Sequence, residues 1–291
     1  MQSTADRPDT PARNRRSRSA WKPNGLPPLL ALLVLLVLIT ESLALGSRTL
    51  SPEEVWQGLL AHDNSVASKV VWELRIHRTV LAVVVGASLA VAGVVMQALT
   101  RNPLAEPGIL GVNAGASLAV VAAIGGFGFT SVNQYLPFAF AGAAAAAVLV
   151  HVMSRRSSDS GPARLVLAGV ALGASLSSIT GTMTMYNSKA FDSYRFWVVG
   201  SLENRKLEVL LWVAPFLAVG LVLALASAHS LNALALGDEQ ATALGVNLAV
   251  VRGGAFVAIT LLCGAATAAA GPISFIGLVI PHVVRLLVGA D

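Results

Sequence analysis

Charged side chains are scarce in this sequence of 291 residues, in which Asp, Glu, Lys and Arg together make up 12%. Soluble domains carry about 25% of these residues. Apolar residues make up 55% of the chain, and the mean hydropathy is +0.71. These values exclude a disordered chain, a nucleic-acid-binding domain and an ordinary cytosolic enzyme. A single cysteine, Cys263, excludes an internal disulfide framework.

Two kinds of chemical motif are also missing. None of the lysines follows a glycine, so the chain has no phosphate-binding loop of the form G-x-x-x-x-G-K-[ST]. The sequence has no H-E-x-x-H motif and no pair of cysteines, which argues against a metal-dependent hydrolase. We therefore expect no catalytic residue, no bound metal and no cofactor, and we do not expect this chain to be an enzyme.

Long stretches without a charged residue are the main feature that is present. A transmembrane helix needs about 20 apolar residues. Two of the uncharged runs are too long for one helix, and turn formers divide them at Gly125–Gly128 and Gly271–Pro272. Ala, Leu and Gly dominate without the alternation of barrel strands, so we expect an all-α polytopic membrane protein. The eight predicted transmembrane helices cover about residues 27–45, 79–99, 108–125, 135–153, 165–186, 208–227, 251–270 and 273–289.

The distribution of Lys and Arg orients these helices. With the N-terminus in the cytoplasm, twelve of the 20 basic residues fall on the inner side of the membrane. Residues 1–26 are rich in Arg, Ser, Pro and Asp, and we expect a disordered basic cytoplasmic tail that precedes one membrane domain over residues 27–291. We read the net charge of +5 as an orientation signal and expect no nucleic-acid partner.

Small residues recur at every fourth position of the fifth predicted helix, at Gly169, Gly173, Ser177 and Gly181. This spacing forms one stripe along a helix, and small residues allow helices to pack closely in lipid. The stripe fits ordinary packing within the chain, and it also fits a position against a second subunit or a central transport pathway. Spacing alone leaves both interpretations open.

Five longer strings, in a fixed order, carry more specific information. They are R-I-H-R at 75–78, NPLAEPGILGVNAG at 102–115, LVLAGVALG at 165–173, LALGDEQATALGV at 234–246 and GPISFIGLVIPH at 271–282. Over about residues 30–291 the sequence resembles the FecCD family, the permeases of bacterial ABC importers for iron-siderophores, haem and cobalamin.

This resemblance implies a multi-pass permease of the bacterial plasma membrane that imports, as a first hypothesis, ferric siderophores. Its partners would be cytoplasmic ATPase subunits, an extracytoplasmic substrate-binding protein, a second permease copy or paralogue, and membrane lipid. The missing phosphate-binding loop agrees, because the ATPase would be a separate chain. Haem or cobalamin import is an alternative. An ion-coupled secondary carrier and a non-transporting membrane protein are alternatives of other classes.

The resemblance also implies a docking role for two arginines. Arg75 and Arg78 lie three residues apart, so they share one helix face just outside the second predicted span. Two guanidinium groups suit carboxylates on a partner surface, and by resemblance they would receive acidic residues of the binding protein. The alternative is a pair of interfacial arginines bound to lipid headgroups.

The long inner loop over residues 229–248 resembles the segment through which the family couples to its ATPase. Asp238 and Glu239 match the positive end of a helix dipole, and Gly245 fits a C-terminal cap, so a short helix over about 238–244 is expected after Gly237. The alternative is an amphipathic helix lying on the membrane, which the absence of Lys and Arg disfavours.

The sequence departs from the family pattern at two places. Ile76 and His77 stand where family members usually have Leu and Pro, which affects the angle at which the second helix is entered. The family also continues with two more helices, whereas this sequence ends at Asp291. We therefore expect a truncated product or fragment that inserts into the membrane but does not support chelate uptake by itself.

Overall fold

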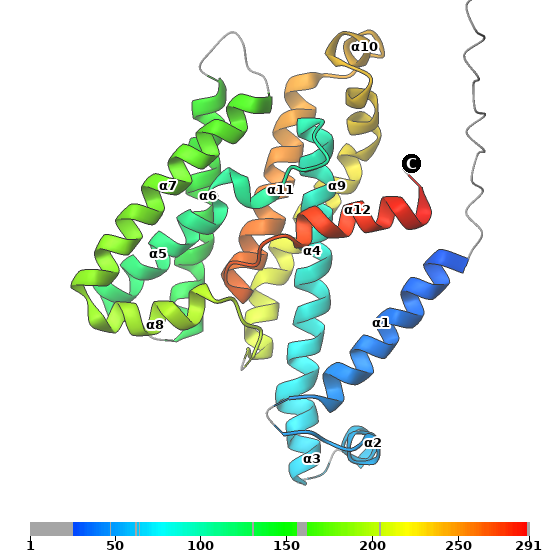
Figure 1. The fold of residues 1–291 in the computed structure, drawn as a ribbon, viewed down its shortest axis with the longest axis vertical. Coiled ribbons are helices and arrows are strands. Elements are labelled where there is room, and N and C mark those ends of the chain that lie inside the picture. Colours follow the sequence, from blue (N-terminus) through cyan, green and yellow to red (C-terminus); the bar gives the residue numbers. More distant parts are fainter. Residues whose placement is uncertain are drawn as a thin grey trace, which may run out of the picture.

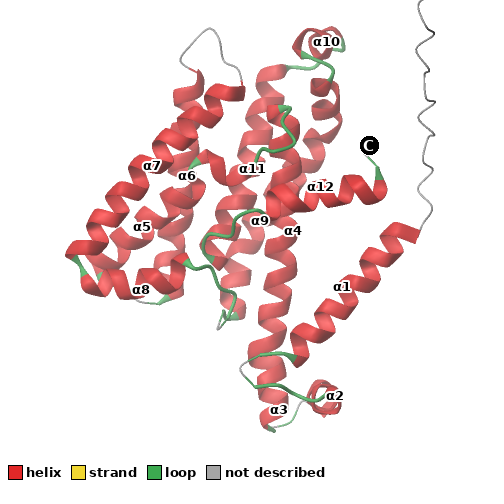
Figure 2. Cartoon of the chain, in the orientation of Figure 1, coloured by secondary structure: helices red, strands yellow, loops and turns green. Residues whose placement is uncertain are grey.

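The computed structural model describes residues 26–46, 48–61, 63, 65–129, 131–155, 162–203 and 205–289. Figures 1 and 2 show that these residues form helices joined by loops, and the described part of the chain contains no strand. The expected all-α fold is confirmed. The predicted tail over residues 1–26 lies outside the described residues, except for Leu26.

The helices have the following bounds. In chain order they are α1 (Leu26–Ala44), α2 (Pro52–Ala61), α3 (Val66–Lys69), the π-helical η1 (Val70–Arg75), α4 (Ile76–Thr100), the 3₁₀ turn η2 (Pro107–Leu110), α5 (Val112–Phe127), α6 (Val132–Arg155), α7 (Pro162–Tyr186), α8 (Ser188–Val198), α9 (Leu207–Ala235), α10 (Asp238–Ala243), α11 (Leu248–Ala270) and α12 (Ile276–Val288).

Each of the eight predicted apolar runs contains a helix, but these helices differ in length. Five segments of the described chain are long and apolar enough to cross a membrane: Val66–Thr100, Val132–Ser154, Ala163–Tyr186, Leu207–Ala235 and Leu248–Ala270. The apolar stretches of α1, α5 and α12 are shorter. The structure therefore has the character of a multi-pass membrane protein, and it does not confirm the count of eight spans.

Two helices extend much further than the predicted spans. The second long helix begins at Val66 and continues through η1 into α4, so Arg75 and Arg78 lie within a helix and not before it. α9 continues to Ala235, which shortens the loop that we expected from residue 229. Uncharged polar residues such as Asn232 end an apolar run without ending a helix, because a helix satisfies its own backbone groups.

α11 forms the centre of the molecule. Almost every residue from Ala255 to Ala270 is buried, and the helix packs most extensively on α9 and α4. Its alanines and Gly264 allow neighbouring helices to approach closely. Figure 1 shows α5, α6 and α7 grouped on one side of α11, with α8 across one end of that group and α10 at the opposite end of the molecule.

The first helix is attached mainly through one end. Most of the large apolar side chains of α1, from Leu29 to Leu38, are exposed. Figure 1 shows α1 leaning away from the other helices and meeting α4 near its C-terminal end. There the hydroxyl groups of Ser42 and Thr79 form a hydrogen bond of 2.7 Å. The C-terminal end of α1 therefore provides its main attachment to the other helices.

The last described helix runs across the molecule. Residues 271–275 between α11 and α12 are not helical, and Gly271 and Phe275 both have positive φ, at 81° and 70°. α12 has 13 residues and is therefore about 20 Å long, against about 30 Å for a hydrocarbon core. In Figure 1 it crosses α4 at a steep angle. The region expected to form a span over 273–289 is thus a short crossing helix.

Candidate functional site

The two predicted docking arginines hold the C-terminal end of α1. Arg75 is buried, with 4% of its surface exposed, and its guanidinium donates to the backbone carbonyl oxygens of Leu43 and Arg48. Arg78 is half-buried and donates to the carbonyl oxygens of Ser42 and Leu45, the latter at 2.8 Å. The last carbonyl groups of a helix have no partner within the helix, so these arginines satisfy them.

This geometry differs from a pair of free guanidinium groups. The two arginines do share one helix face, but that face is turned toward α1. Burial commits Arg75 to the contacts within the chain. Arg78 also borders an open crevice, so it is the member of the pair that can reach a partner.

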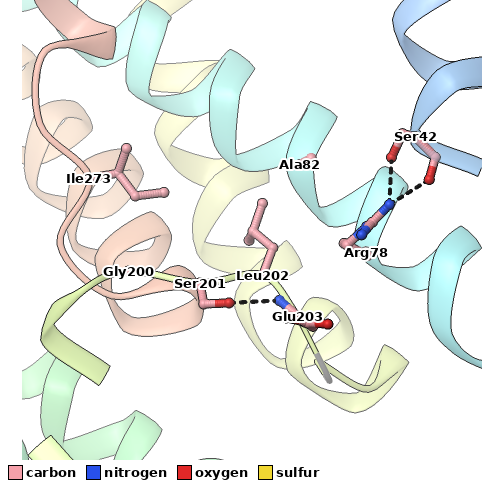
Figure 3. Close-up of a pocket in the computed structure, with 8 residues that line it drawn as sticks. All are labelled: Ser42, Arg78, Ala82, Gly200, Ser201, Leu202, Glu203 and Ile273. Atoms are coloured by element: carbon pink, nitrogen blue, oxygen red, sulfur yellow. Dashed lines mark hydrogen bonds between the residues drawn. The ribbon is translucent and has the colours of Figure 1, made fainter. Parts of the chain in front are cut away.

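The crevice beside Arg78 has a volume of about 450 Å³. Its walls come from α1, α4, the loop after α8 and the loop before α12, as Figure 3 shows, and its lining residues are Ser42, Arg78, Ala82, Gly200, Ser201, Leu202, Glu203 and Ile273. Ser42 and Arg78 stand on one side, whereas Ser201 and Glu203 stand across the opening. The lining of the crevice therefore includes charged residues of both signs, Arg78 and Glu203, together with the apolar residues Ala82, Leu202 and Ile273.

At the opposite end of the molecule, α10 has well-defined boundaries. Asp238 and Glu239 occupy its first turn, where acidic groups suit the helix dipole. At its other end, the N–H of Gly245 donates to Thr242 O at 2.9 Å and the N–H of Val246 donates to Ala241 O at 3.0 Å. This pair of bonds is the Schellman motif, and Gly245 has the positive φ of 82° that the motif requires.

Asp238 makes two ion pairs that we did not predict. Its Oδ1 atom accepts from Arg101, the residue that follows α4, and its Oδ2 atom accepts from Arg252 of α11 at 2.6 Å. Partial burial raises the pKa of Asp238, but the hydrogen bonds and positive charges of Arg252 and Arg101 outweigh it, so the pKa lies below its ordinary value. Asp238 is therefore ionised at neutral pH and connects α10 to two long helices.

The other side of α10 is open. Glu239, Gln240 and Leu244 are exposed, and so is Leu236 just before the helix, whereas Ala241 faces the core. The exposed fractions of Leu236 and Leu244 are 61% and 65%. α10 therefore presents an acidic surface that is flanked by two exposed leucines.

The stripe of small residues on α7 is divided between two environments. Gly169 is buried, and a Cβ atom at this position would lie 1.8 Å from the carbonyl oxygen of Ile109 in η2. Gly173 and Gly181 have open space where a Cβ would stand, and Ser177 is exposed. One end of the stripe thus packs within the chain, and the remainder faces outward.

A polar connection between α4 and α12 was missed at the sequence level. Gln97 is buried, its Oε1 atom accepts from Arg285 at 2.6 Å, and its Nε2 atom donates to the carbonyl oxygen of Gly277 at 3.3 Å. A lone amide inside an apolar run was the available signal, because polar groups within membrane helices usually have a specific partner. Which residue would be that partner depends on the crossing of α12, which spacing does not reveal.

The described residues contain no group of three or more His, Cys, Asp and Glu side chains that could hold a metal ion. Three other features are candidates for contacts with partners. They are the crevice at Arg78, the open face of α10 with the ion pairs of Asp238, and the outward part of the α7 stripe.

Comparisons with known proteins agree on one family. The model of the FecCD transport family matches residues 32–291. The ferric enterobactin transport system permease protein FepD of Escherichia coli (strain K12) is 44% identical over 263 residues, which cover 89% of this chain and 78% of that protein. The Fe(3+)-citrate import system permease protein YfmD of Bacillus subtilis (strain 168) is 40% identical over 261 residues, covering 90% of this chain and 78% of that protein.

Two further relatives extend this comparison. The hemin transport system permease protein HmuU of Yersinia pestis is 35% identical over 269 residues, covering 89% of this chain and 78% of that protein. A solved structure, reported as a metal-chelate type ABC transporter in an inward-facing conformation, is 30% identical with a TM-score of 0.77, covering 92% of this chain and 82% of that chain. The sequence strings, the helical fold and these relatives together place the chain in the FecCD transport family.

Proposed function

We propose that this chain is the permease subunit of an ATP-driven, binding-protein-dependent importer of ferric siderophores in the bacterial plasma membrane. The observation that carries the proposal is the 44% identity with a ferric enterobactin permease over nearly the whole chain. The haem permease among the relatives is less similar, at 35% identity. ATP hydrolysis belongs to separate subunits, since the sequence has no phosphate-binding loop.

The ATPase subunits bind the end of the molecule that carries α10. Gly237, Asp238, Glu239 and Gly245 define this short helix, and its open face presents Glu239 between two exposed leucines. With the N-terminus in the cytoplasm, and with α1, α4, α5, α6, α7 and α9 each crossing the membrane once, α10 follows an even number of crossings and lies on the cytoplasmic side. In Figure 1, α10 and α8 lie at opposite ends of the molecule, as this topology requires.

The substrate-binding protein docks at the end that carries the arginine pair. Arg78 takes part directly, because it lines the crevice and is only half-buried. Arg75 acts from beneath, by holding the end of α1 and the following loop through the carbonyl oxygens of Leu43 and Arg48. In this proposal Arg78 contacts the binding protein, and Arg75 holds the docking surface in position from within the fold.

A second permease copy or paralogue covers the outward part of the α7 stripe. Gly173, Ser177 and Gly181 lack neighbours within the described chain on that face, whereas Gly169 is already packed. Small residues contribute to helix association only when another backbone approaches them closely. The transport pathway would run beside this face, and membrane lipid would surround the exposed apolar helices such as α1.

The test is uptake of radioactive iron, supplied as ferric enterobactin, by cells that express the whole gene that encodes this sequence, together with the genes of its ATPase and binding protein. We expect uptake that requires ATP and persists when an ionophore collapses the ion gradients. A matched strain has the ATPase inactivated at the lysine of its phosphate-binding loop. Uptake of haem and of cobalamin is measured in the same strains.

Uptake that survives loss of the ATPase and stops with the ionophore would favour an ion-coupled carrier and contradict the proposal. Uptake of haem or cobalamin but not of the ferric siderophore would keep the importer class and overturn the substrate. Charge reversal of Arg78 to Glu is expected to lower binding-protein affinity by one to two orders of magnitude, since a close charge pair contributes about 1.5 kcal/mol or more. The variant loses the bonds to Ser42 O and Leu45 O, whereas Arg75 keeps its bonds to Leu43 O and Arg48 O.

A further inference from the structure

The end of α4 has an unusual residue in a special position. Arg101 follows the helix with φ 51° and ψ 32°, in the left-handed region. Its N–H donates to Ala98 O at 3.3 Å, and the N–H of Asn102 donates to Gln97 O at 3.2 Å. These bonds again form a Schellman motif, whose left-handed residue is usually glycine. An arginine there accepts backbone strain, and its side chain is the feature that glycine would lack.

That side chain reaches the coupling helix. Arg101 and Arg252 each take one carboxylate oxygen of Asp238, so a single acidic residue joins the ends of α4 and α11 to α10. All three side chains are between 37% and 43% exposed. Ion pairs at this exposure add little to stability because water screens them. Their arrangement therefore needs an explanation other than holding the fold together.

The connection to α4 is special because α4 is not adjacent to α10 in the chain. α10 is linked covalently to α9 and α11, so these helices follow its movement in any case. α4 receives that movement through Arg101. One turn earlier, Gln97 joins α4 to α12 by accepting from Arg285 and donating to Gly277 O. Arg101 and Gln97, which are four residues apart near the end of α4, thus connect this helix to α10 and to α12.

We propose that Arg101, Asp238 and Arg252 form an ionic joint that transmits movement of α10 to α4 and α11, and through Gln97 to α12. The proposal rests on the proposed function, in which α10 is the part that the ATPase moves. Contacts of this kind, in series between packed helices, carry energetic coupling between distant sites. Arg101 is a positioning residue in this scheme, because it acts through Asp238 and touches neither the cargo nor ATP.

Replacing Arg101 with glycine removes the ion pair with Asp238 but keeps the helix cap at the end of α4. Glycine adopts the left-handed conformation without strain, so the end of α4 keeps its cap and the melting temperature stays equal to or above that of the wild type. Only the connection to Asp238 is lost. Arg101→Lys keeps the charge without the planar fork, and Asp238→Asn removes the charge from the centre of the joint. Asp192→Asn, in the exposed ion pair with Arg195 on α8, is the matched control.

The experiment reconstitutes each variant with the ATPase and the binding protein in liposomes. Three quantities are measured: capture of the ATPase, basal ATP hydrolysis, and stimulation of hydrolysis by binding protein loaded with ferric siderophore. For Arg101→Gly we expect capture within about twofold of wild type and a loss of stimulation of about tenfold, a usual size for coupling between sites. The stimulation of Arg101→Lys is expected to lie between that of the wild type and that of Arg101→Gly. The double variant with Asp238→Asn should be no worse than Asp238→Asn alone, because both changes break the same contact.

The outcomes separate the joint from the function on which it rests. If the wild type neither captures the ATPase nor responds to the binding protein, the proposed function is wrong. If loaded binding protein stimulates ATP hydrolysis equally well with the wild type and with Arg101→Gly, the proposal of an ionic joint is wrong while the proposed function stands. A lowered melting temperature together with weak capture in Arg101→Gly would show that Arg101 serves only to hold the structure, which also overturns the joint.

Discussion

Replacing Gly93 with alanine tests directly how α12 lies on α4. A Cβ atom at Gly93 would stand 2.0 Å from the carbonyl oxygen of Gly277 and 2.6 Å from its Cα atom, distances at which one of the backbones must move. Moving α12 by about 1 Å relieves the contact but pulls Gly277 away from Gln97, whose hydrogen bond to it is already 3.3 Å long. Both the packing and the polar connection are then disturbed.

The expected cost follows from these two effects. Overpacking of a close contact costs about 1–3 kcal/mol, and an interhelical hydrogen bond in a membrane protein contributes about 0.6 kcal/mol. A total of about 2–4 kcal/mol corresponds to a fall in Tm of about 3–6 °C in a chain of this size. Thermal unfolding in detergent, followed by fluorescence or by loss of the monodisperse peak, measures it.

Two further glycines provide the controls. Gly86 lies on the same helix with nothing within 4 Å of an added Cβ, so Gly86→Ala should keep or raise the Tm. A Cβ at Gly277 would lie 2.9 Å from Pro107 Cδ and 3.0 Å from Leu89 O, which predicts a smaller loss than at Gly93. If the Tm of the Gly93→Ala protein equals that of the Gly86→Ala protein, the close crossing of α4 and α12 is refuted.

Three other predictions concern single residues. On α7, Gly169→Ala should lower the Tm because its Cβ would lie 1.8 Å from a carbonyl oxygen of η2, whereas Gly173→Ala should leave the Tm unchanged and weaken only permease dimerisation, measured by cross-linking. Gly245→Ala should strain the left-handed end of α10 by about 1–2 kcal/mol and weaken ATPase capture, with Gly253→Ala as the unstrained control. The lowered pKa of Asp238 means that its ion pairs contribute fully above about pH 4 and are lost as the pH falls through the folded-state value. The Tm difference between wild type and Asp238→Asn should therefore be constant from pH 7 to about pH 4, and narrow below it; a difference that grew on acidification would contradict the sign.

Local signals in the sequence predicted local structure well. The short helix after Gly237 and its end at Gly245 were expected from the dipole rule and the preference for glycine at a left-handed cap, and α10 has both features. The break at Gly271–Pro272 was expected because both residues are turn formers, and Gly271 follows α11 with a positive φ. Such features depend on residues within one helical turn, so the sequence contains nearly all of the information that determines them.

Partners across the fold were not predictable in this way. Spacing placed Arg75 and Arg78 on one face, but it does not tell which helix that face meets, and the end of α1 proved to be the neighbour. Asp238 was interpreted through the helix dipole, whereas its strongest contacts are with Arg101 and Arg252, which are 137 and 14 residues away in the sequence. Long-range contacts depend on how helices cross, and periodicity carries no information about crossing angles.

The unwound stretch between α11 and α12 has a consequence for the electrical barrier that the protein forms. The N–H of Phe275 donates to a carboxylate oxygen of Glu106 at 2.6 Å, and the carbonyl oxygen of Ala270 accepts from the N–H of Ser201 at 2.7 Å. The helix that follows begins beside Leu89 and Gly93, inside the long apolar segment Val66–Thr100. Hydrocarbon does not tolerate irregular backbone, so protein or water surrounds it here. The Glu106 carboxylate and the backbone dipoles of this non-helical stretch lie close together, and they shorten the low-dielectric path that a charged solute has to cross.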